Sequence, residues 1–144
     1  MPTAMVVYRS HTGITRRYGE EIAAFLELRG MTVTVVSVGE CEMSSLSGAD
    51  YLFLGCWTSG LFVVMQHPDE PWLAFVRDMP KLRSAAEGGP KVALFTTYKF
   101  VAGSQFAKMR AALGSKTSPP ELELKARDGH LSPKDDEALE LFIR

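Results

Sequence analysis

Apolar positions along the chain fall into two patterns that predict strands. Continuous apolar runs cover residues 4–8, 51–54 and 92–95, as is typical of short strands buried on both faces. Residues 32–35 and 121–125 instead alternate between apolar and polar side chains, which indicates strands with one solvated face. The pattern therefore predicts five strands, three of them central and two at the edges of a sheet.

Helical apolar stripes separate these strands. The spacing predicts helices over residues 14–29, 70–79, 105–113 and 133–142. Asp69, Ser104 and Ser132 stand where the last three begin, and each has the kind of side chain that caps a helix N-terminus. Gly30 and Gly114 follow the first and third helices, where glycine commonly ends a helix.

Strand and helix alternate along the chain, which predicts a parallel α/β sheet with helices on both faces. Placing the alternating strands at the edges gives the strand order 2-1-3-4-5. Only the second connection, residues 39–48, is short for a helix. At roughly 100–200 residues per domain, the chain of 144 residues is expected to form one domain, 1–144. Ligands of such sheets bind at the carboxyl ends of the strands, between strands one and three.

Composition excludes several classes of protein. Sixteen Lys and Arg against seventeen Asp and Glu give a net charge of −1, whereas nucleic-acid-binding domains are usually clearly basic. No apolar run approaches the roughly 18 residues of a membrane span, so no membrane partner is expected. The two cysteines, Cys41 and Cys56, lack metal-ligand spacing. A cytoplasmic protein with reduced thiols fits best.

The loop after the first strand is rich in hydroxyl groups and leads directly into a helix. It reads Ser10, His11, Thr12, Gly13, Ile14 and Thr15. Backbone N–H groups at a helix N-terminus bind anions, and the hydroxyl groups add further donors. The loop therefore predicts a phosphate site, with a polar cap on the helix as the simpler alternative.

The pattern Ser-x-Thr-Gly-x-Thr after the first strand resembles the FMN-phosphate loop of the flavodoxin family. This resemblance implies a flavodoxin-like three-layer sandwich with FMN as cofactor. In the family's second loop, a threonine helps to hold the phosphate, and Thr58 matches it. Trp57 stands at a proline position of that loop, and Trp57 or Phe62 could supply a stacking face for the flavin. Packing at the strand end is the alternative role for Trp57.

The loop after the fourth strand resembles the Gly-Ser-Tyr-Gly-Trp-x-x-Gly loop of flavin-binding domains in larger electron-transfer flavoproteins. Thr97, Tyr98, Phe100 and Gly103 match that pattern, whereas Lys99 replaces a glycine. The resemblance implies that this loop contacts the flavin ring.

The resemblance implies an FMN-binding flavoprotein that mediates electron transport between larger redox protein partners, as a monomer or weak dimer. An electron carrier is favoured over a stand-alone oxidoreductase because the chain has no room for a nicotinamide domain. A small FMN-dependent reductase of quinones or other acceptors is one alternative. A flavin-free binding module is another, supported by the atypical second loop and by Lys99.

The charge differs from the family pattern. Classical flavodoxins are strongly acidic, whereas residues 61–110 carry seven basic and four acidic groups. We therefore expect weaker electrostatic steering than in a classical flavodoxin, and a less negative potential for the second electron. Lys99 is the nearest candidate charge.

Overall fold

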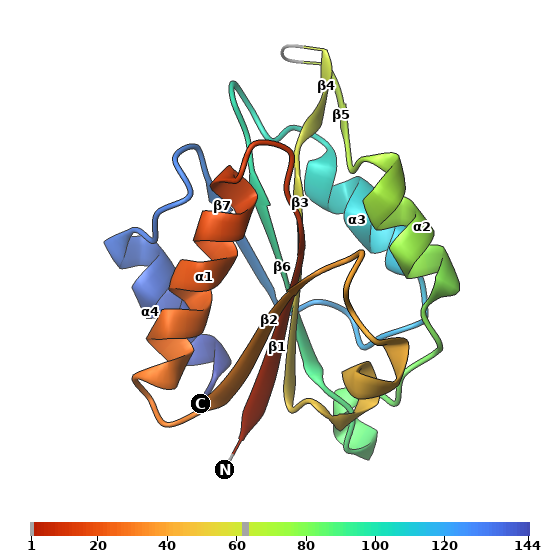
Figure 1. Ribbon diagram of the computed structural model, residues 1–144, viewed down its shortest axis with the longest axis vertical. Helices are drawn as coiled ribbons and strands as arrows, with labels where there is room; N and C mark the ends of the chain where they lie inside the picture. The colour runs from red at the N-terminus through yellow and green to blue at the C-terminus, as the bar shows by residue number, and fades with distance from the viewer. Residues whose placement is uncertain (1, 62–63) are drawn as a thin grey trace.

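A five-stranded parallel sheet lies at the centre of the computed structural model, which describes residues 2–61 and 64–144 (Figure 1). In spatial order the strands are β2 (Thr32–Ser37), β1 (Thr3–Arg9), β3 (Tyr51–Trp57), β6 (Lys91–Thr97) and β7 (Leu122–Ala126). Two further strands, β4 (Ser59–Leu61) and β5 (Val64–His67), form a separate antiparallel hairpin. The order of the central sheet is therefore the predicted 2-1-3-4-5, and that prediction is confirmed.

Burial along each strand follows the hydrophobic pattern. Val6 and Val7 on the central strand β1 are both fully buried, because helices cover both faces of the sheet. On the edge strand β7, Leu124 is buried while its neighbours Glu123 and Lys125 are exposed. The distinction between central and edge strands predicted from sequence is confirmed.

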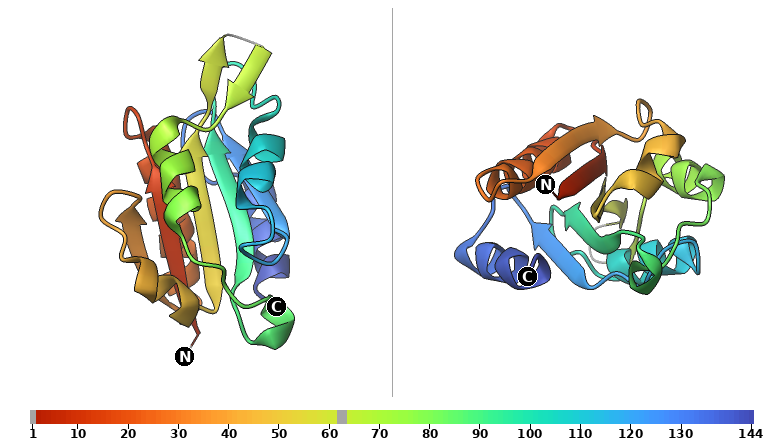
Figure 2. Two further views of the ribbon diagram at one scale, coloured as in Figure 1. Left: turned by 90° about the vertical axis from the view of Figure 1, so that its right-hand side faces the viewer. Right: turned by 90° about the horizontal axis from the view of Figure 1, so that it is seen from below.

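Helices cover both faces of the sheet, as Figures 1 and 2 show. One face carries α1 (Ile14–Glu27) and α4 (Pro133–Phe142), and the other carries α2 (Glu70–Asp78) and α3 (Gln105–Leu113). The short second connection contains a 3₁₀ helix, η1 (Met43–Gly48), and a second 3₁₀ helix, η2 (Ala85–Glu87), precedes β6. Within residues 2–61 and 64–144, no helix has the length and apolar character needed to cross a membrane.

Two of the three predicted N-caps are confirmed. The Asp69 carboxylate accepts a hydrogen bond from the backbone N–H of Trp72, and Ser132 forms a reciprocal capping box with Asp135. Ser104 occupies the predicted N-cap position of α3, but its side chain does not cap the helix. Its hydroxyl instead donates to the carbonyl of Gln66 on β5, at 2.8 Å, and so ties the start of α3 to the hairpin.

The hairpin β4–β5 extends beyond the carboxyl end of the sheet (Figure 2). The hydrophobic pattern does not indicate this hairpin, because β4 has only three residues and the apolar positions of the segment do not alternate. Met65 on β5 has a φ of 61°, in the left-handed region that a non-glycine residue rarely adopts. The hairpin strands β4 and β5 therefore stand above the carboxyl ends of the central strands.

Gly55 on β3 is required by close packing against β6. A Cβ atom at this position would lie 2.1 Å from Cε2 of the Phe95 ring, which is fully buried. We expect Gly55→Ala to lower the free energy of unfolding by about 1–3 kcal/mol, measured by urea denaturation. Gly39→Ala is the matched control, because a Cβ atom at position 39 would have no neighbouring atom within 4 Å. Equal stability of the two variants would contradict this packing argument.

Candidate functional site

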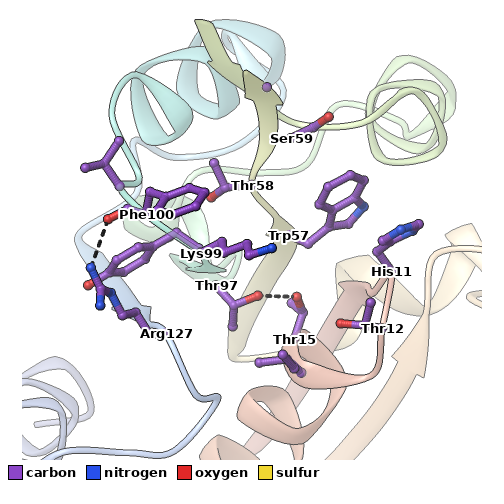
Figure 3. A pocket seen from close by; sticks show the side chains of 14 residues that line it. His11, Thr12, Thr15, Trp57, Thr58, Ser59, Thr97, Lys99, Phe100 and Arg127 are labelled. Atoms are coloured by element: carbon purple, nitrogen blue, oxygen red, sulfur yellow. Dashed lines mark hydrogen bonds between the residues drawn. The ribbon is translucent and has the colours of Figure 1, made fainter. Parts of the chain in front are cut away.

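A cavity of about 680 Å³ opens at the carboxyl ends of β1, β3 and β6 (Figure 3). Its lining comes from all three predicted loops, so the site lies at the switch point between β1 and β3. The lining residues are His11, Thr12, Ile14, Thr15, Trp57, Thr58, Ser59, Gly60, Thr97, Tyr98, Lys99, Phe100, Val101 and Arg127.

Ten of the thirteen residues singled out from sequence line this cavity. Ser10, Gly13 and Gly103 do not. Gly103 has a φ of 53°, in the left-handed region that favours glycine, and its backbone lies against the Gln66 side chain of the hairpin. Phe62, the second candidate for ring stacking, lies outside the described residues.

Sequence reasoning missed four lining residues: Ser59, Gly60, Val101 and Arg127. Arg127 directly follows β7, at the edge of the sheet where the site was expected. Its position relative to the strand end could therefore have identified it. Ser59 and Gly60 belong to β4, and the hairpin that places them at the cavity had no clear sequence signal.

The first loop directs backbone donors toward its own centre. Gly13 adopts a left-handed φ of 94° and forms the N-cap of α1. Oγ of Ser10 accepts hydrogen bonds from the N–H groups of Gly13 and Arg16, at 3.0 and 3.3 Å. Ser10 thus shapes the loop from outside the cavity, while the exposed Thr12 forms no side-chain hydrogen bond with a described residue and lines the cavity. Two amides at the start of α1 are thus taken by Ser10, while the dipole of α1 still favours negative charge there.

Threonine hydroxyls join the strand ends beneath the cavity. Oγ1 of Thr15 lies 2.6 Å from Oγ1 of Thr97, and both side chains are buried. Oγ1 of Thr58 lies 2.8 Å from Oγ1 of Thr96. These contacts hold the first loop and β3 against β6. The hydroxyls of Thr15 and Thr58 therefore have structural partners within the protein.

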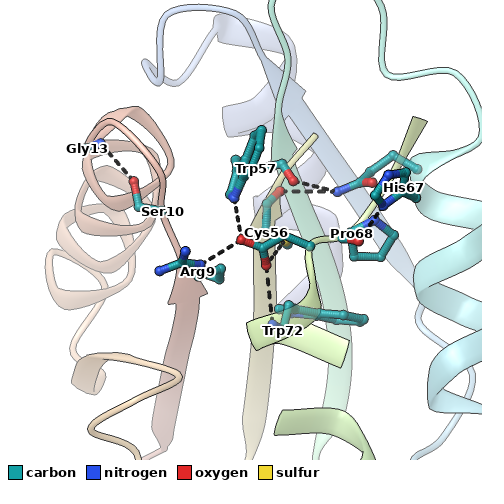
Figure 4. A network of polar contacts seen from close by, with 10 residues as sticks. Arg9, Ser10, Gly13, Cys56, Trp57, His67, Pro68 and Trp72 are labelled. Atoms are coloured by element: carbon teal, nitrogen blue, oxygen red, sulfur yellow. Dashed lines mark hydrogen bonds and ion pairs between the residues drawn. The ribbon is translucent and has the colours of Figure 1, made fainter. Parts of the chain in front are cut away.

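One wall of the cavity is a stacked pair of rings. The His11 and Trp57 rings are 4.6 Å apart at an interplanar angle of 23°. The Trp57 indole N–H donates to Oδ2 of Asp69 at 2.6 Å, and Nε of Arg9 contacts the same oxygen at 2.7 Å (Figure 4). Trp57 is only partly buried and faces the cavity. Its hydrogen bond to Asp69 restricts the orientation of the indole.

Cys56 lies beneath this wall and is fully buried. Burial raises the pKa of the Cys56 thiol far above its ordinary value, and its Sγ lies 3.6 Å from Oδ1 of Asp69. The side chain is therefore a neutral thiol that packs as a small apolar residue.

The opposite wall is formed by the loop after β6. Nη2 of Arg127 donates to the carbonyl of Phe100 at 3.3 Å, and its guanidinium lies over the Tyr98 ring at 5.8 Å. Nζ of Lys99 lies 5.7 Å from the centre of the Phe100 ring. Figure 3 shows the cavity between this loop and the His11–Trp57 pair.

The charged side chains of the cavity lining are all basic. Lys99 and Arg127 line the cavity, and none of the lining residues is acidic. Neither cation forms an ion pair with a residue that the structure describes. Residues 2–61 and 64–144 contain no group of three or more His, Cys, Asp or Glu residues suited to a metal ion. The site therefore suits an anionic ligand with an aromatic or apolar part.

Comparison of the sequence with known proteins finds similarity to a flavodoxin. No family model matches the chain. Over 93 residues it is 32% identical to a flavodoxin from Clostridium beijerinckii, an alignment that covers 65% of this chain and 62% of that protein. The chain thus spans under two thirds of the length of this curated relative.

Solved structures show the same fold over nearly the whole chain. Two-electron reduced flavodoxin from Megasphaera elsdenii has a TM-score of 0.76 at 21% identity, covering 96% of this chain and 97% of that one. A short-chain flavodoxin associated with a non-canonical PDU bacterial microcompartment has a TM-score of 0.73 at 20% identity, covering 99% and 94%. Rubredoxin oxygen:oxidoreductase from Desulfovibrio gigas has a TM-score of 0.70 at 15% identity, where the match covers 97% of this chain and 34% of that larger chain.

Asp69 has two roles, because it caps α2 and holds the cavity wall. Asp69→Ala removes the acceptor for Trp57, Arg9 and the backbone of Trp72 together. We expect a loss of about 2–4 kcal/mol in the free energy of unfolding, measured by urea denaturation, because the helix cap, the bond to the partly buried indole and the ion pair with Arg9 are lost together. Ser132→Ala, which removes a cap alone, should cost about 1 kcal/mol. Equal losses for the two variants would show that the wall contacts of Asp69 add nothing to stability.

Proposed function

Because the chain is flavodoxin-like in sequence and in fold, we propose that it binds one FMN noncovalently and carries electrons between larger redox proteins. The observation that carries this proposal is the cavity described above, where a hydroxyl-rich loop at the N-terminus of α1 and two aromatic walls meet at the carboxyl ends of the strands. FMN has a phosphate at one end and a planar aromatic ring at the other, so its two parts match these features.

The size and chemistry of the lining fit FMN. A volume of about 680 Å³ lies within the roughly 300–1,000 Å³ of small-molecule sites. The absence of acidic residues from the lining avoids repulsion of a phosphate dianion. The N-terminus of α1 offers backbone donors, and its dipole favours negative charge there.

Residues of the first loop would bind the phosphate. The hydroxyl of Thr12 has no described partner, so it is the side-chain donor best placed for this role. Thr15 and Thr58 already bond to Thr97 and Thr96, and we assign them mainly to positioning the loops. Ser10 supports the same loop, because its Oγ accepts hydrogen bonds from the backbone N–H groups of Gly13 and Arg16.

Residues of the two walls would orient the ring. Trp57 offers an aromatic face whose orientation is fixed by Asp69, and Tyr98 and Phe100 offer faces on the other side. FMN, when bound, supplies the capacity to accept and release electrons one or two at a time. The chain itself binds and orients the ring and limits access of water, and no proton-transferring pair of side chains is required for this function.

Replacing the free hydroxyl of the first loop tests the phosphate assignment. We expect Thr12→Val to weaken FMN binding by about 1.5–3 kcal/mol, roughly tenfold or more, because a hydrogen bond to a charged group is lost. Riboflavin lacks the phosphate, so its affinity should not change. Quenching of flavin fluorescence measures both affinities. Thr34→Val, on the exposed edge strand β2, makes the same chemical change away from the cavity.

The parent protein in the same titration tests the proposal as a whole. A colourless protein that does not quench FMN fluorescence would overturn FMN binding and favour a flavin-free module. Steady reduction of a quinone by a reduced nicotinamide, with this protein alone, would favour a small reductase. If Thr12→Val lowers FMN and riboflavin affinity equally, the phosphate assignment is wrong while FMN binding stands.

The charge of the lining predicts the redox behaviour of the FMN-loaded protein. Lys99 and Arg127, with no acidic neighbour in the lining, favour negative charge on the reduced ring. We expect the potential for the second electron to be less negative than in a classical acidic flavodoxin, and Lys99→Glu to lower it. A redox titration in the presence of mediators measures this potential. A second potential as low as that of an acidic flavodoxin would contradict the prediction.

A further inference from the structure

The mouth of the cavity exposes several large apolar side chains. In the described part of the chain, five large hydrophobic side chains are exposed: Leu28, Met65, Phe100, Val101 and Leu141. Met65 on the hairpin is 68% exposed, and Phe100 and Val101 on the loop after β6 are 45% and 38% exposed. The hairpin and this loop adjoin, because Gln66 contacts Gly103 and Ser104. Exposed apolar side chains gathered beside a cavity are typical of a surface that binds another molecule.

Three cations lie on the loop after β6 and at the end of β7. Lys99 and Arg127 line the cavity, and the exposed Lys125 lies one residue before the end of β7. None of the three forms an ion pair with a described residue. At the same end of the sheet, Arg9 is paired with Asp69, so it adds little to the outward charge.

Acidic residues offset only part of this charge. Residues 98–110 contain no Asp or Glu. Asp128 adjoins Arg127 and keeps its negative charge, because the backbone N–H of His130 donates to its carboxylate and lowers its pKa. The loop after β6 and the end of β7 therefore present a net positive surface beside the cavity.

We propose that this docking rim binds an acidic surface of a protein redox partner; we define the rim as Met65, Lys99, Phe100, Val101, Lys125 and Arg127. The inference rests on the proposed function, since it names the partner class for the same cavity. The apolar side chains supply contact area, and the three cations select a partner of opposite charge and speed encounter with it. This polarity is the reverse of that expected for an acidic carrier and a basic partner.

A second copy of the chain is a poorer occupant of the docking rim. A two-fold contact would place Lys99, Lys125 and Arg127 against the same cations of the other copy, which is repulsive. Nucleic acid is also less suitable, because the net charge of the chain is −1 and the rim offers three cations beside apolar side chains.

Binding of two probe proteins of opposite charge tests the inference. The probes are an acidic plant-type [2Fe–2S] ferredoxin and a basic mitochondrial cytochrome c, titrated into the ¹⁵N-labelled chain while backbone amide shifts are recorded by NMR. At 20 mM NaCl we expect the ferredoxin to bind more tightly and to shift the amides of the docking rim. Raising NaCl to 300 mM should weaken that complex roughly tenfold, because exposed charges are screened.

Two double charge-reversal variants separate the effect of the docking rim on binding from the effect of the net charge. Lys99→Glu with Lys125→Glu should weaken ferredoxin binding roughly fivefold or more and strengthen cytochrome c binding. Lys81→Glu with Arg83→Glu makes the same change in net charge near η2, at the opposite end of the sheet, where both residues are exposed. This control should change ferredoxin affinity less than about twofold.

The opposite results would overturn the inference. These are tighter binding of cytochrome c by the parent chain, ferredoxin shifts away from the docking rim, or equal effects of the two double variants. Tighter binding of a 20-nucleotide single strand of DNA, or dimerisation through the rim in sedimentation, would also overturn it. Because the titrations are run with and without FMN, and FMN binding is measured separately by fluorescence, loss of the proposed function is distinguished from loss of the inferred partner.

Discussion

The hydrogen bonds of the Asp69 carboxylate connect the fold to the site. This one carboxylate accepts hydrogen bonds from the backbone N–H of Trp72 in α2, from the indole of Trp57 and from the guanidinium of Arg9. It therefore joins a helix to the ends of β3 and β1. It is also nearly buried, where hydrogen bonds are strong and an unsatisfied partner is costly. The wall of the cavity is therefore held by the same contacts that position α2 on the sheet.

The parts of the structure that follow from local pattern were predicted from sequence. Continuous apolar runs identified the central strands, and alternation identified the edges, because burial on one or two faces decides which residues a strand tolerates. The order of the sheet then placed the cavity at the right strand ends. Ten candidate residues gathered there because the carboxyl ends of parallel strands share one edge of the sheet.

The parts that depend on contacts between distant segments were not predicted. Serine is a typical N-cap residue, but the hydroxyl of Ser104 donates its hydrogen bond to the carbonyl of Gln66, 38 residues earlier. The same approach of β5 brings Gln66 against Gly103, a contact between distant segments that no local pattern indicates. The β4 residues Ser59 and Gly60 reach the cavity only through the hairpin, whereas Arg127 directly follows β7 and could have been identified from that position.

The two strands of the hairpin β4–β5 pair with each other and not with the five strands of the central sheet. A change in its length or side chains therefore leaves the register of β3 and β6 untouched. Its fixed contacts lie at its base, through Gln66 and the start of α3. Such a segment is free to diverge among descendants of one ancestral protein, so that new protein contacts can evolve on an unchanged scaffold.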